Sequence, residues 1–424
     1  MYEYHYLNMP YNNSKNISLI LFYFSAICFF FNSSNLFSNE IYYVQSPKAK
    51  LLASPKLNSD GTVLSIGSSL KKISQSGLFY QVRYGEQTGY VSKLFISAFP
   101  PGKQIKLGSS NSSNEQALGR QRASDFTKTA AARGLSETEK LRVRGSSEDF
   151  DFESVRWLEN IGQSSREDTM NYEIVTENKN NSFLLSFAND SLPAETKAEV
   201  KMGRILSARL IKKYGLIKNE SSTIYLNNLG KSIAEITSRQ DLSFRFGILD
   251  SNEINAFACP GGFIFITRAA LEHTKNEPEL VGILSHEISH VVLNHHEAVP
   301  HDNIILEIIS SLLATPSIEI VSSTTLSAIE AYNEEFYEKG RDKDTEFEAD
   351  ESAFQLMLQL GYLPHNYMNY LNHISKLANN NTILKTHPNT LQRTKKIENL
   401  INTMNPILEL KKSNDEFEKA KKSL

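Results

Sequence analysis

Two histidines four residues apart, His286 and His290, flank a glutamate, Glu287. At this spacing both imidazoles project from one face of a helix and can hold one metal ion, while the glutamate activates a water. The positions around them, from Leu280 to Val292, are mostly apolar. Unpaired His and Glu side chains would be costly in such a helix. The pattern therefore predicts a zinc-dependent peptidase; a surface helix with these residues by chance is the alternative.

A catalytic zinc usually takes three protein ligands and one water, so a third ligand must come from elsewhere. The segment Thr345–Ala353 begins a second predicted helix and offers the carboxylates Glu346, Glu348, Asp350 and Glu351. Glu346 and Asp350 share a helix face, so one can bind metal while the other supports a ligand histidine. The alternative is ordinary acidic enrichment in the first turn of a helix, where the dipole favours it.

The two motifs together resemble those of the HtpX/BepA group of zinc metallopeptidases, related to the CAAX prenyl endopeptidases. That group shares a His-Glu-x-x-His helix followed by Glu-x-x-x-Asp on a second helix. Three further stretches are similar: the helical region Glu195–Asp250, the Asn-Ala-Phe and Pro-Gly-Gly segment Ile254–Thr267, and the His-Pro segment Thr386–Thr390 with Arg393. The resemblance covers about residues 191–405.

The resemblance implies a role for each residue of the two motifs. His286, His290 and Glu346 would bind Zn²⁺, one ion per chain. Glu287 would be the general base for the bound water and then the proton donor to the leaving amine. Asp350 would orient a ligand imidazole.

Other polar residues are weaker candidates. Asn255 lies where the resemblance places a strand at the edge of the cleft, so it could bind substrate; a turn-forming asparagine is equally consistent. His387 is a candidate for stabilising the oxyanion or for sealing the zinc in a resting state; a helix-entry residue before a proline is the alternative. His295, His296 and His301 predict a polar helix exit rather than a second metal site.

Residues 1–39 have the pattern of an export signal. The apolar run Ile17–Phe31 is right for a signal-peptide core and short for a membrane span. We expect an exported protein, periplasmic or envelope-associated, with cleavage at the end of this range. A retained N-terminal anchor and a lipid on Cys28 are the alternatives. After cleavage only Cys259 remains, so no intrachain disulfide is expected.

Residues 40–100 have the pattern of a small all-β domain, with β-branched and aromatic runs separated by glycine-containing turns. The expected strands are Tyr42–Val44, Leu51–Leu52, Leu70–Ile73, Phe79–Tyr84 and Gly89–Val91. The segment resembles a bacterial SH3-like barrel. Such domains bind cell-wall peptides or proteins, and a packing module without a ligand is the alternative. Tyr42, Tyr80 and Tyr90 are the first candidates for a binding groove.

The remaining segments are less regular. Residues 101–190 are linker-like, with possible helices at Gln116–Val143 and Phe150–Ile161. The apolar stretch within 302–344 is too broken for a membrane span, and the resemblance implies that it helps cover the cleft. Residues 406–424 form a charged, helix-prone tail.

Bulk composition is consistent with this organisation. A length of 424 residues favours two or three domains, and a formal charge of −3 gives no reason to expect nucleic acid as a partner. The predicted fold is α+β: a mainly helical, gluzincin-type zinc peptidase domain with a small β-sheet, preceded by an all-β SH3-like barrel.

The predicted function is an exported metalloendopeptidase that cleaves unfolded or misassembled envelope proteins. An envelope-assembly chaperone or wall-associated binding protein with a gated zinc site is the main alternative, and a cell-wall hydrolase is a third.

Overall fold

The computed structural model describes the chain in separate stretches. They are residues 40–101, 150–164, 194–295, 343–377, 387, 390–404 and 415–423. Several predictions lie outside them: the export signal in 1–39, the helix at Gln116–Val143, nearly all of the segment 302–344, and the side chains of His296 and His301.

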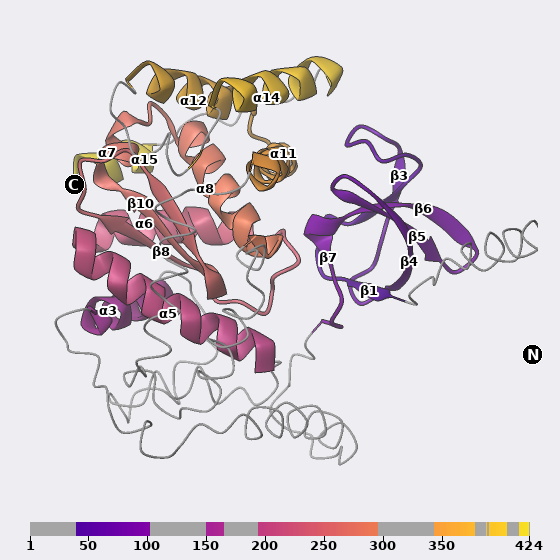
Figure 1. Ribbon diagram of the computed structural model, residues 1–424, viewed down its shortest axis with the longest axis horizontal. Coiled ribbons are helices and arrows are strands. Elements are labelled where there is room, and N and C mark those ends of the chain that lie inside the picture. The colour runs from indigo at the N-terminus through magenta and orange to yellow at the C-terminus, as the bar shows by residue number, and fades with distance from the viewer. Residues whose placement is uncertain are drawn as a thin grey trace, which may run out of the picture. The chain divides into compact units, whose positions relative to one another are not determined.

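The N-terminal part is an antiparallel sheet with the strand order β3-β2-β6-β5-β4-β1-β7 (Figure 1). Its strands are β1 (Ile41–Val44), β2 (Lys50–Leu52), β3 (Gly61–Val63), β4 (Ser69–Ser76), β5 (Phe79–Tyr84), β6 (Gln87–Ser92) and β7 (Ile96–Ser97), with the 3-10 turn η1 (Lys93–Phe95) before the last. Gly77 and Gly85 have φ of 56° and 57° in the two hairpin turns. Residues with a Cβ rarely adopt this conformation, so these glycines fix the turns.

The five strands expected from the sequence are present, and β3 and β7 are additional. The extra strands have only three and two residues, too few to show an alternating pattern. They form the two ends of the sheet, and no pairing joins them in the described part of the chain. The prediction of an N-terminal antiparallel sheet is confirmed, whereas a closed SH3-like barrel is not.

The rest of the described chain is mainly helical around a small sheet. Its helices are α3 (Phe152–Ser164), α5 (Ala194–Tyr214), α6 (Glu220–Ala234), α7 (Arg268–His273), α8 (Glu277–Val292), α11 (Lys343–Gln359), α12 (His365–Leu377), α14 (Thr390–Met404) and α15 (Asp415–Lys422). The strands are β8 (Arg245–Leu249), β9 (Ala256–Cys259) and β10 (Phe263–Thr267). The central strand, β10, is parallel to β8 and antiparallel to β9. The predicted mixture of helices and a small sheet is confirmed.

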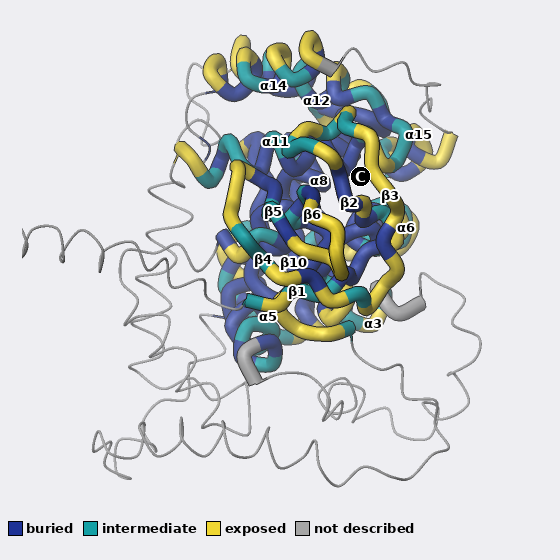
Figure 2. Tube along the Cα trace, turned by 90° about the vertical axis from the view of Figure 1, so that its right-hand side faces the viewer, coloured by how far each residue is buried: buried dark blue, intermediate teal, exposed yellow. Residues whose placement is uncertain are grey.

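Helix α8 is the centre of this part, and every one of its residues is buried (Figure 2). The Asn276 side chain caps its N-terminus by accepting from the Glu279 amide, which satisfies a donor that the helix leaves unpaired. Helices α6, α11 and α12 and strand β9 pack against it. Gly282 lets α12 come close, because an added Cβ would lie 2.5 Å from the Cβ of Tyr367. The polar side chains of α8 are therefore held in place by elements that pack against the helix on several sides.

The Pro-Gly-Gly segment is a tight 3-10 turn, η4 (Pro260–Gly262), between β9 and β10. Gly261 and Gly262 have φ of 71° and 88°, and the Gly261 amide donates to Glu199 of α5. A Cβ on Gly203 of α5 would meet the Pro260 carbonyl oxygen at 1.8 Å. These glycines are thus needed for the close approach of α5 to the turn.

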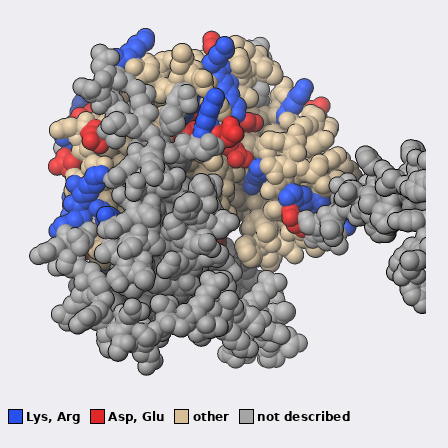
Figure 3. All heavy atoms as spheres, in the orientation of Figure 1, with Lys and Arg blue, Asp and Glu red and all other residues tan. Residues whose placement is uncertain are grey.

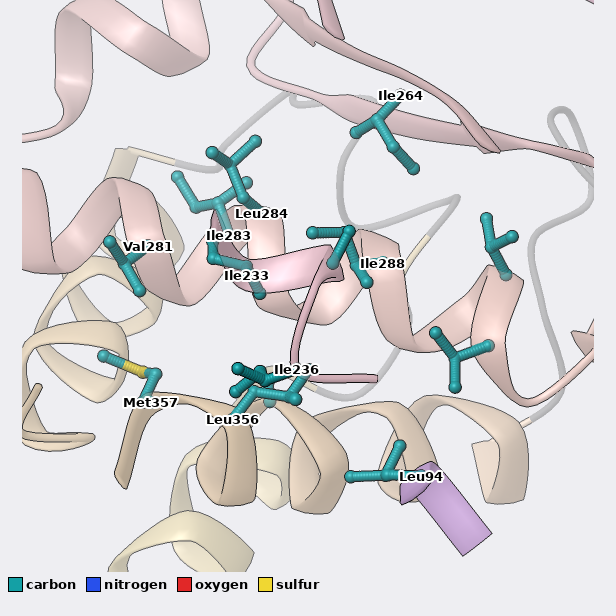
Figure 4. Packing of buried hydrophobic residues seen from close by; sticks show 14 of the residues in the cluster. Leu94, Ile233, Ile236, Ile264, Val281, Ile283, Leu284, Ile288, Leu356 and Met357 are labelled. Carbon is teal, nitrogen blue, oxygen red and sulfur yellow. The ribbon is translucent and has the colours of Figure 1, made fainter. Parts of the chain in front are cut away.

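One apolar cluster runs from the N-terminal sheet to α8 and α11. Figure 4 shows Leu94 of η1 lying by the helix that bears Leu356 and Met357, with Ile236 nearby. The buried Ser46 hydroxyl also donates to the Ile236 carbonyl, at 2.5 Å. Residues from Ile41 to Leu424 accordingly form one compact unit.

A second apolar cluster joins α3 to α5 and to the small sheet, with Val155 and Leu158 of α3 fully buried. The amphipathic helix predicted at Phe150–Ile161 is therefore present as α3. The charged tail contains α15, whose Phe417 is buried and packs near Tyr225 of α6.

None of the described helices is long and apolar enough to cross a bilayer. On the face shown in Figure 3, basic and acidic side chains are interspersed among uncharged ones over the described surface.

Candidate metal centre

Three side chains from α8 and α11 converge on one point. The Nε2 atoms of His286 and His290 lie 3.1 Å apart. Glu346 places Oε2 3.5 Å from Nε2 of His286 and Oε1 3.3 Å from Nε2 of His290. The four-residue spacing within α8 and the packing of α11 against it bring these atoms together.

These distances fit a tetrahedral zinc. Two ligands that are each bonded to zinc at their usual lengths lie roughly 3.3 Å from each other, and the three distances between the side chains are 3.1, 3.3 and 3.5 Å. Glu346 Oε1 is also buried without a hydrogen-bond partner in the described part of the chain. A buried carboxylate oxygen of this kind is costly unless something binds it. The donor set, two imidazoles and a carboxylate, is one that zinc commonly takes.

Each of the two histidines has a different partner on its other ring nitrogen. Nδ1 of His286 lies 3.0 Å from Oδ1 of Asp350. Nδ1 of His290 lies 2.8 Å from Nδ1 of His295. A partner on Nδ1 favours one tautomer and would leave Nε2 as the atom that binds a metal.

Asp350 is itself held by two residues that the sequence analysis gave no role. Arg393 donates to both of its carboxylate oxygens at 2.8 Å, and the Tyr367 hydroxyl donates to Oδ1 at 3.2 Å. Arg393 also lies 3.2 Å from Glu346 Oε2. All these groups are buried, so the arginine balances two carboxylates inside the protein. A buried charge is otherwise expensive.

This charge arrangement sets the pKa values of the cluster. Burial alone would raise the pKa of Asp350, but Arg393 and His286 lower it to about 2. Burial also opposes ionisation of Glu346, yet His387 and Arg393 hold the pKa of that carboxyl well below its usual range. Burial and Arg393 lower the pKa of His286, whereas Asp350 and Glu346 outweigh them and raise it to about 9. Both carboxylates are therefore ionised at neutral pH, whereas His286 is protonated there, so a bound zinc would displace that proton.

His387 and Glu287 complete the site. His387 places Nδ1 2.9 Å from Glu346 Oε2 and Nε2 3.8 Å from Glu287 Oε1. One donor atom each from His286, His290, Glu346 and His387 lies within 4.8 Å of all the others. Oε2 of Glu287 is buried and has no hydrogen-bond partner among the described residues.

A cavity adjoins this cluster, and its lining includes Asn255, Ile283, Glu287, Tyr370, Leu371 and His387. Asn255 is fully buried at the start of β9, and its Oδ1 accepts from the Ala256 amide at 2.9 Å. The structure thus places Asn255 beside Glu287 in the cavity wall while its side chain also organises the local backbone.

The structure brings together all the residues proposed for chemistry from the sequence, and it adds three. Arg393, Tyr367 and His295 contact the ligands or their partners, and only Arg393 stood in a segment that the resemblance had marked. His295 lies just beyond the C-terminal end of α8, where a helix exit was predicted, but it is buried, with 5% of its surface exposed.

The three tyrosines proposed for a binding groove belong to two different clusters. The rings of Tyr42 and Tyr80 lie 4.9 Å apart, and Lys72 covers both. Tyr90 packs on a separate group around Leu52 and Phe79.

Comparison with known families agrees with this site. Residues 221–401, from α6 to α14, match the model of peptidase family M48. This part of the chain is therefore similar to the M48 peptidases. M48 metallopeptidases use zinc, and the matched range contains the two α8 histidines, Glu287, Glu346 and His387.

Individual relatives of the M48 domain are distant. The beta-barrel assembly-enhancing protease of Escherichia coli (strain K12) is 27% identical over 224 residues, which are 50% of this chain and 45% of that protein. The mitochondrial metalloendopeptidase OMA1 of Schizosaccharomyces pombe is 28% identical over 100 residues, 23% of this chain and 30% of that protein. OMA1 of Arabidopsis thaliana is 25% identical over 170 residues, 39% of this chain and 33% of that protein. The chain spans about half the length of the first of these relatives, and the likenesses support a zinc metallopeptidase.

Proposed function

We propose that the protein is a zinc-dependent metalloendopeptidase with a gluzincin-type site. The observation that supports this most directly is the triangle of His286 Nε2, His290 Nε2 and the Glu346 carboxylate, with sides of 3.1 to 3.5 Å. Glu287 stands on the same helix beside it. A chance surface motif would not be fully buried or meet a third ligand at this spacing.

Zinc, when bound, supplies Lewis acidity toward a water and a substrate carbonyl. Glu287 takes the proton of the attacking water at a carboxylate oxygen and passes it to the leaving amine. Its buried Oε2, which lacks a hydrogen-bond partner in the described chain, has its lone pairs available for this proton. Asp350 accepts from Nδ1 of His286 and keeps that imidazole in the tautomer that binds metal.

His387 has two possible roles, which predict opposite effects. If Nδ1 takes the place of the fourth ligand, His387 seals the site at rest. If the imidazole donates to the oxyanion, it stabilises the transition state. His387→Ala then raises basal cleavage in the first case and lowers kcat in the second. The sealing role is supported by the position of one His387 donor atom within 4.8 Å of the donor atoms of His286, His290 and Glu346.

The substrates we propose are unfolded or misassembled proteins of the cell envelope. Two observations support this: a relative bears the name beta-barrel assembly-enhancing protease, and residues 1–39 have the pattern of an export signal. The apolar cavity wall formed by Ile283, Tyr370 and Leu371 suits an apolar side chain next to the scissile bond. Asn255 would bind the substrate backbone in the same cavity. Contact with the cell wall or with envelope proteins through the N-terminal sheet stays a prediction from the sequence.

The test is degradation of an unfolded protein by the purified chain, beside Glu287→Gln at equal zinc content. Cleavage by the wild type and none by the variant is the expected result. Equal cleavage by both would exclude Glu287 as the base. An absence of cleavage by both, with zinc bound, would favour the gated chaperone. A parallel assay on purified cell wall excludes or reveals the wall hydrolase.

A further inference from the structure

His295 reaches the metal centre through an unusual turn in the backbone. Residues five apart on an ideal helix point about 140° away from each other, so His290 and His295 should not meet. Helix α8 ends at Val292, however, and Asn294 adopts φ of 54° in the left-handed region. Asn tolerates this conformation better than most residues. The turn brings the His295 ring back, with its centroid 5.0 Å from that of His290.

The contact has a direction. Nε2 of His290 faces His286 and Glu346, so with zinc bound it would be the metal-binding atom and Nδ1 would carry the proton. That proton is donated to Nδ1 of His295, 2.8 Å away. His295 then carries its own proton on Nε2, which lies 3.4 Å from Oε2 of Glu348. Each hydrogen bond fixes the tautomer of the next ring.

The carboxylate that ends this series is anchored by the N-terminal sheet. Lys93, the first residue of η1, lies 2.8 Å from Oε1 of Glu348. The adjacent Ser92 hydroxyl donates to the Gln355 amide oxygen of α11 at 2.9 Å. Leu94 is fully buried in the apolar cluster that contains α8 and α11. Lys93 is therefore held in place by buried contacts on both sides of it in the sequence.

We propose that His295, Glu348 and Lys93 are positioning residues for the zinc ligand His290. This inference rests on the proposed zinc site and extends it: the N-terminal sheet is a structural part of the metal centre and supplies the end of a hydrogen-bonded series to one of the ligands. Its role is to hold an imidazole in the correct orientation and tautomer.

The physical effect of the series is on zinc retention. Without an acceptor, the buried Nδ1–H of His290 loses its hydrogen bond, and the ring loses both orientation and basicity as a ligand. Substitution of such a partner typically costs about 10- to 100-fold in metal affinity. We therefore expect His295→Leu and Lys93→Met to release zinc faster, with the larger effect for the residue that touches His290.

The experiment measures zinc release to a chelator by the full chain and the visible absorption spectrum of the Co²⁺-loaded protein. His295→Leu should release zinc at least about 10-fold faster and shift the Co²⁺ bands, because the ligand field reports the His290 geometry. His295→Asn keeps an acceptor near the Nδ1 position and should restore much of the wild-type behaviour. Lys93→Arg should do the same where Lys93→Met does not.

Two control variants separate positioning from general loosening. Lys72→Met removes another cation over the Tyr80 ring, which Lys93 also covers. Gln355→Leu removes the Ser92 contact between the sheet and α11. Lys72→Met should leave zinc release and the Co²⁺ spectrum unchanged. Gln355→Leu removes only one of the two buried contacts that hold Lys93, so it should speed zinc release less than Lys93→Met does. Adding Lys93→Met to His295→Leu should give no further effect, since the two act in one series.

The outcomes are distinct. Wild-type zinc release and spectrum in both His295→Leu and Lys93→Met would overturn the inference alone. Faster release in Gln355→Leu as large as in Lys93→Met would also overturn it, because loosening of the sheet would then be sufficient. A wild-type chain that takes up no zinc would overturn the proposed function together with the inference. Lys93→Met keeps the test valid if His295→Leu fails to fold, because Lys93 lies at a partly exposed site.

Discussion

The two histidines of α8 are supported in different ways. Nδ1 of His286 meets a carboxylate that is entirely buried and held by Arg393. Nδ1 of His290 meets a second histidine, whose support ends at Glu348 and Lys93, with 30% and 16% of their side-chain surfaces exposed. One ligand thus depends on the interior of the helical part of the chain and the other on contact with the N-terminal sheet. Substitutions near His286 should lower both the stability of the fold and the affinity for zinc. Substitutions in the support of His290 should lower mainly the affinity for zinc.

The largest effect is expected at the ligand that both histidines share. Glu346→Gln replaces a charged donor with a neutral one between the two Nε2 atoms. We expect zinc content to fall below stoichiometric after dialysis, measured by atomic absorption. Stoichiometric zinc in this variant would show that the third ligand is a different residue.

The free energy of unfolding should distinguish the support of His286 from that of His290 most clearly in Asp350→Ala. It leaves Arg393 buried without its bidentate partner, and removal of one member of a buried ion pair costs about 3 to 5 kcal/mol. Denaturant unfolding of the zinc-free protein measures this loss directly. Asp350→Asn is the matched variant, since it keeps the shape but not the charge. A loss below that of Glu348→Gln would contradict the comparison.

Gly282→Ala tests the packing that holds the His286 side. The added Cβ would lie 2.5 Å from Tyr367, so α12 must shift away from α8. Overpacking of this kind costs about 1 to 3 kcal/mol, and the shift should move the Tyr367 hydroxyl away from Asp350. Thermal unfolding measures the loss of stability, and the rate of zinc release reports the displacement of the Tyr367 hydroxyl from Asp350. An unchanged melting temperature would show that α12 adapts without strain.

The smallest effect on stability is expected for Glu348→Gln. Its ion pair with Lys93 is partly exposed, and such pairs contribute about 0 to 1 kcal/mol. Zinc release should nevertheless be faster than in the wild type, because Glu348 ends the series that supports His290. Denaturant unfolding measures the change in stability, and competition with a chelator on the same sample measures the rate of zinc release. A stability loss as large as that of Asp350→Ala would erase the distinction between the two supports.

Helical spacing alone predicted only the contacts between residues on the same helix, whereas the meeting of Glu346 and His387 with the α8 histidines was expected from the family resemblance. The i, i+4 spacing places His286 beside His290 and Glu346 beside Asp350 without any knowledge of the fold. Arg393 and Tyr367 come from α14 and α12, so their meeting with Asp350 depends on tertiary packing. His295 depends on the left-handed conformation of Asn294, which spacing on a helix does not predict.

The same distinction applies to the fold. Alternation of apolar and polar residues was enough to predict strands such as β4 and β5, which have eight and six residues. Strands β3 and β7 were missed because they are too short to show an alternating sequence pattern, and only their hydrogen-bonded pairing with neighbouring strands defines them. The contact of η1 with α11 was missed for a related reason: Leu94 and Lys93 show no periodicity that marks a partner so far along the chain.

The continuous apolar core also affects how the catalytic half can be produced by itself. Leu94 shares that core with Leu356 and Met357, and Ser46 hydrogen-bonds to the carbonyl of Ile236. A protein trimmed to begin at residue 191 would present these apolar side chains to water, and large exposed apolar patches promote aggregation. For soluble expression, residues 41–97 are therefore better retained than removed.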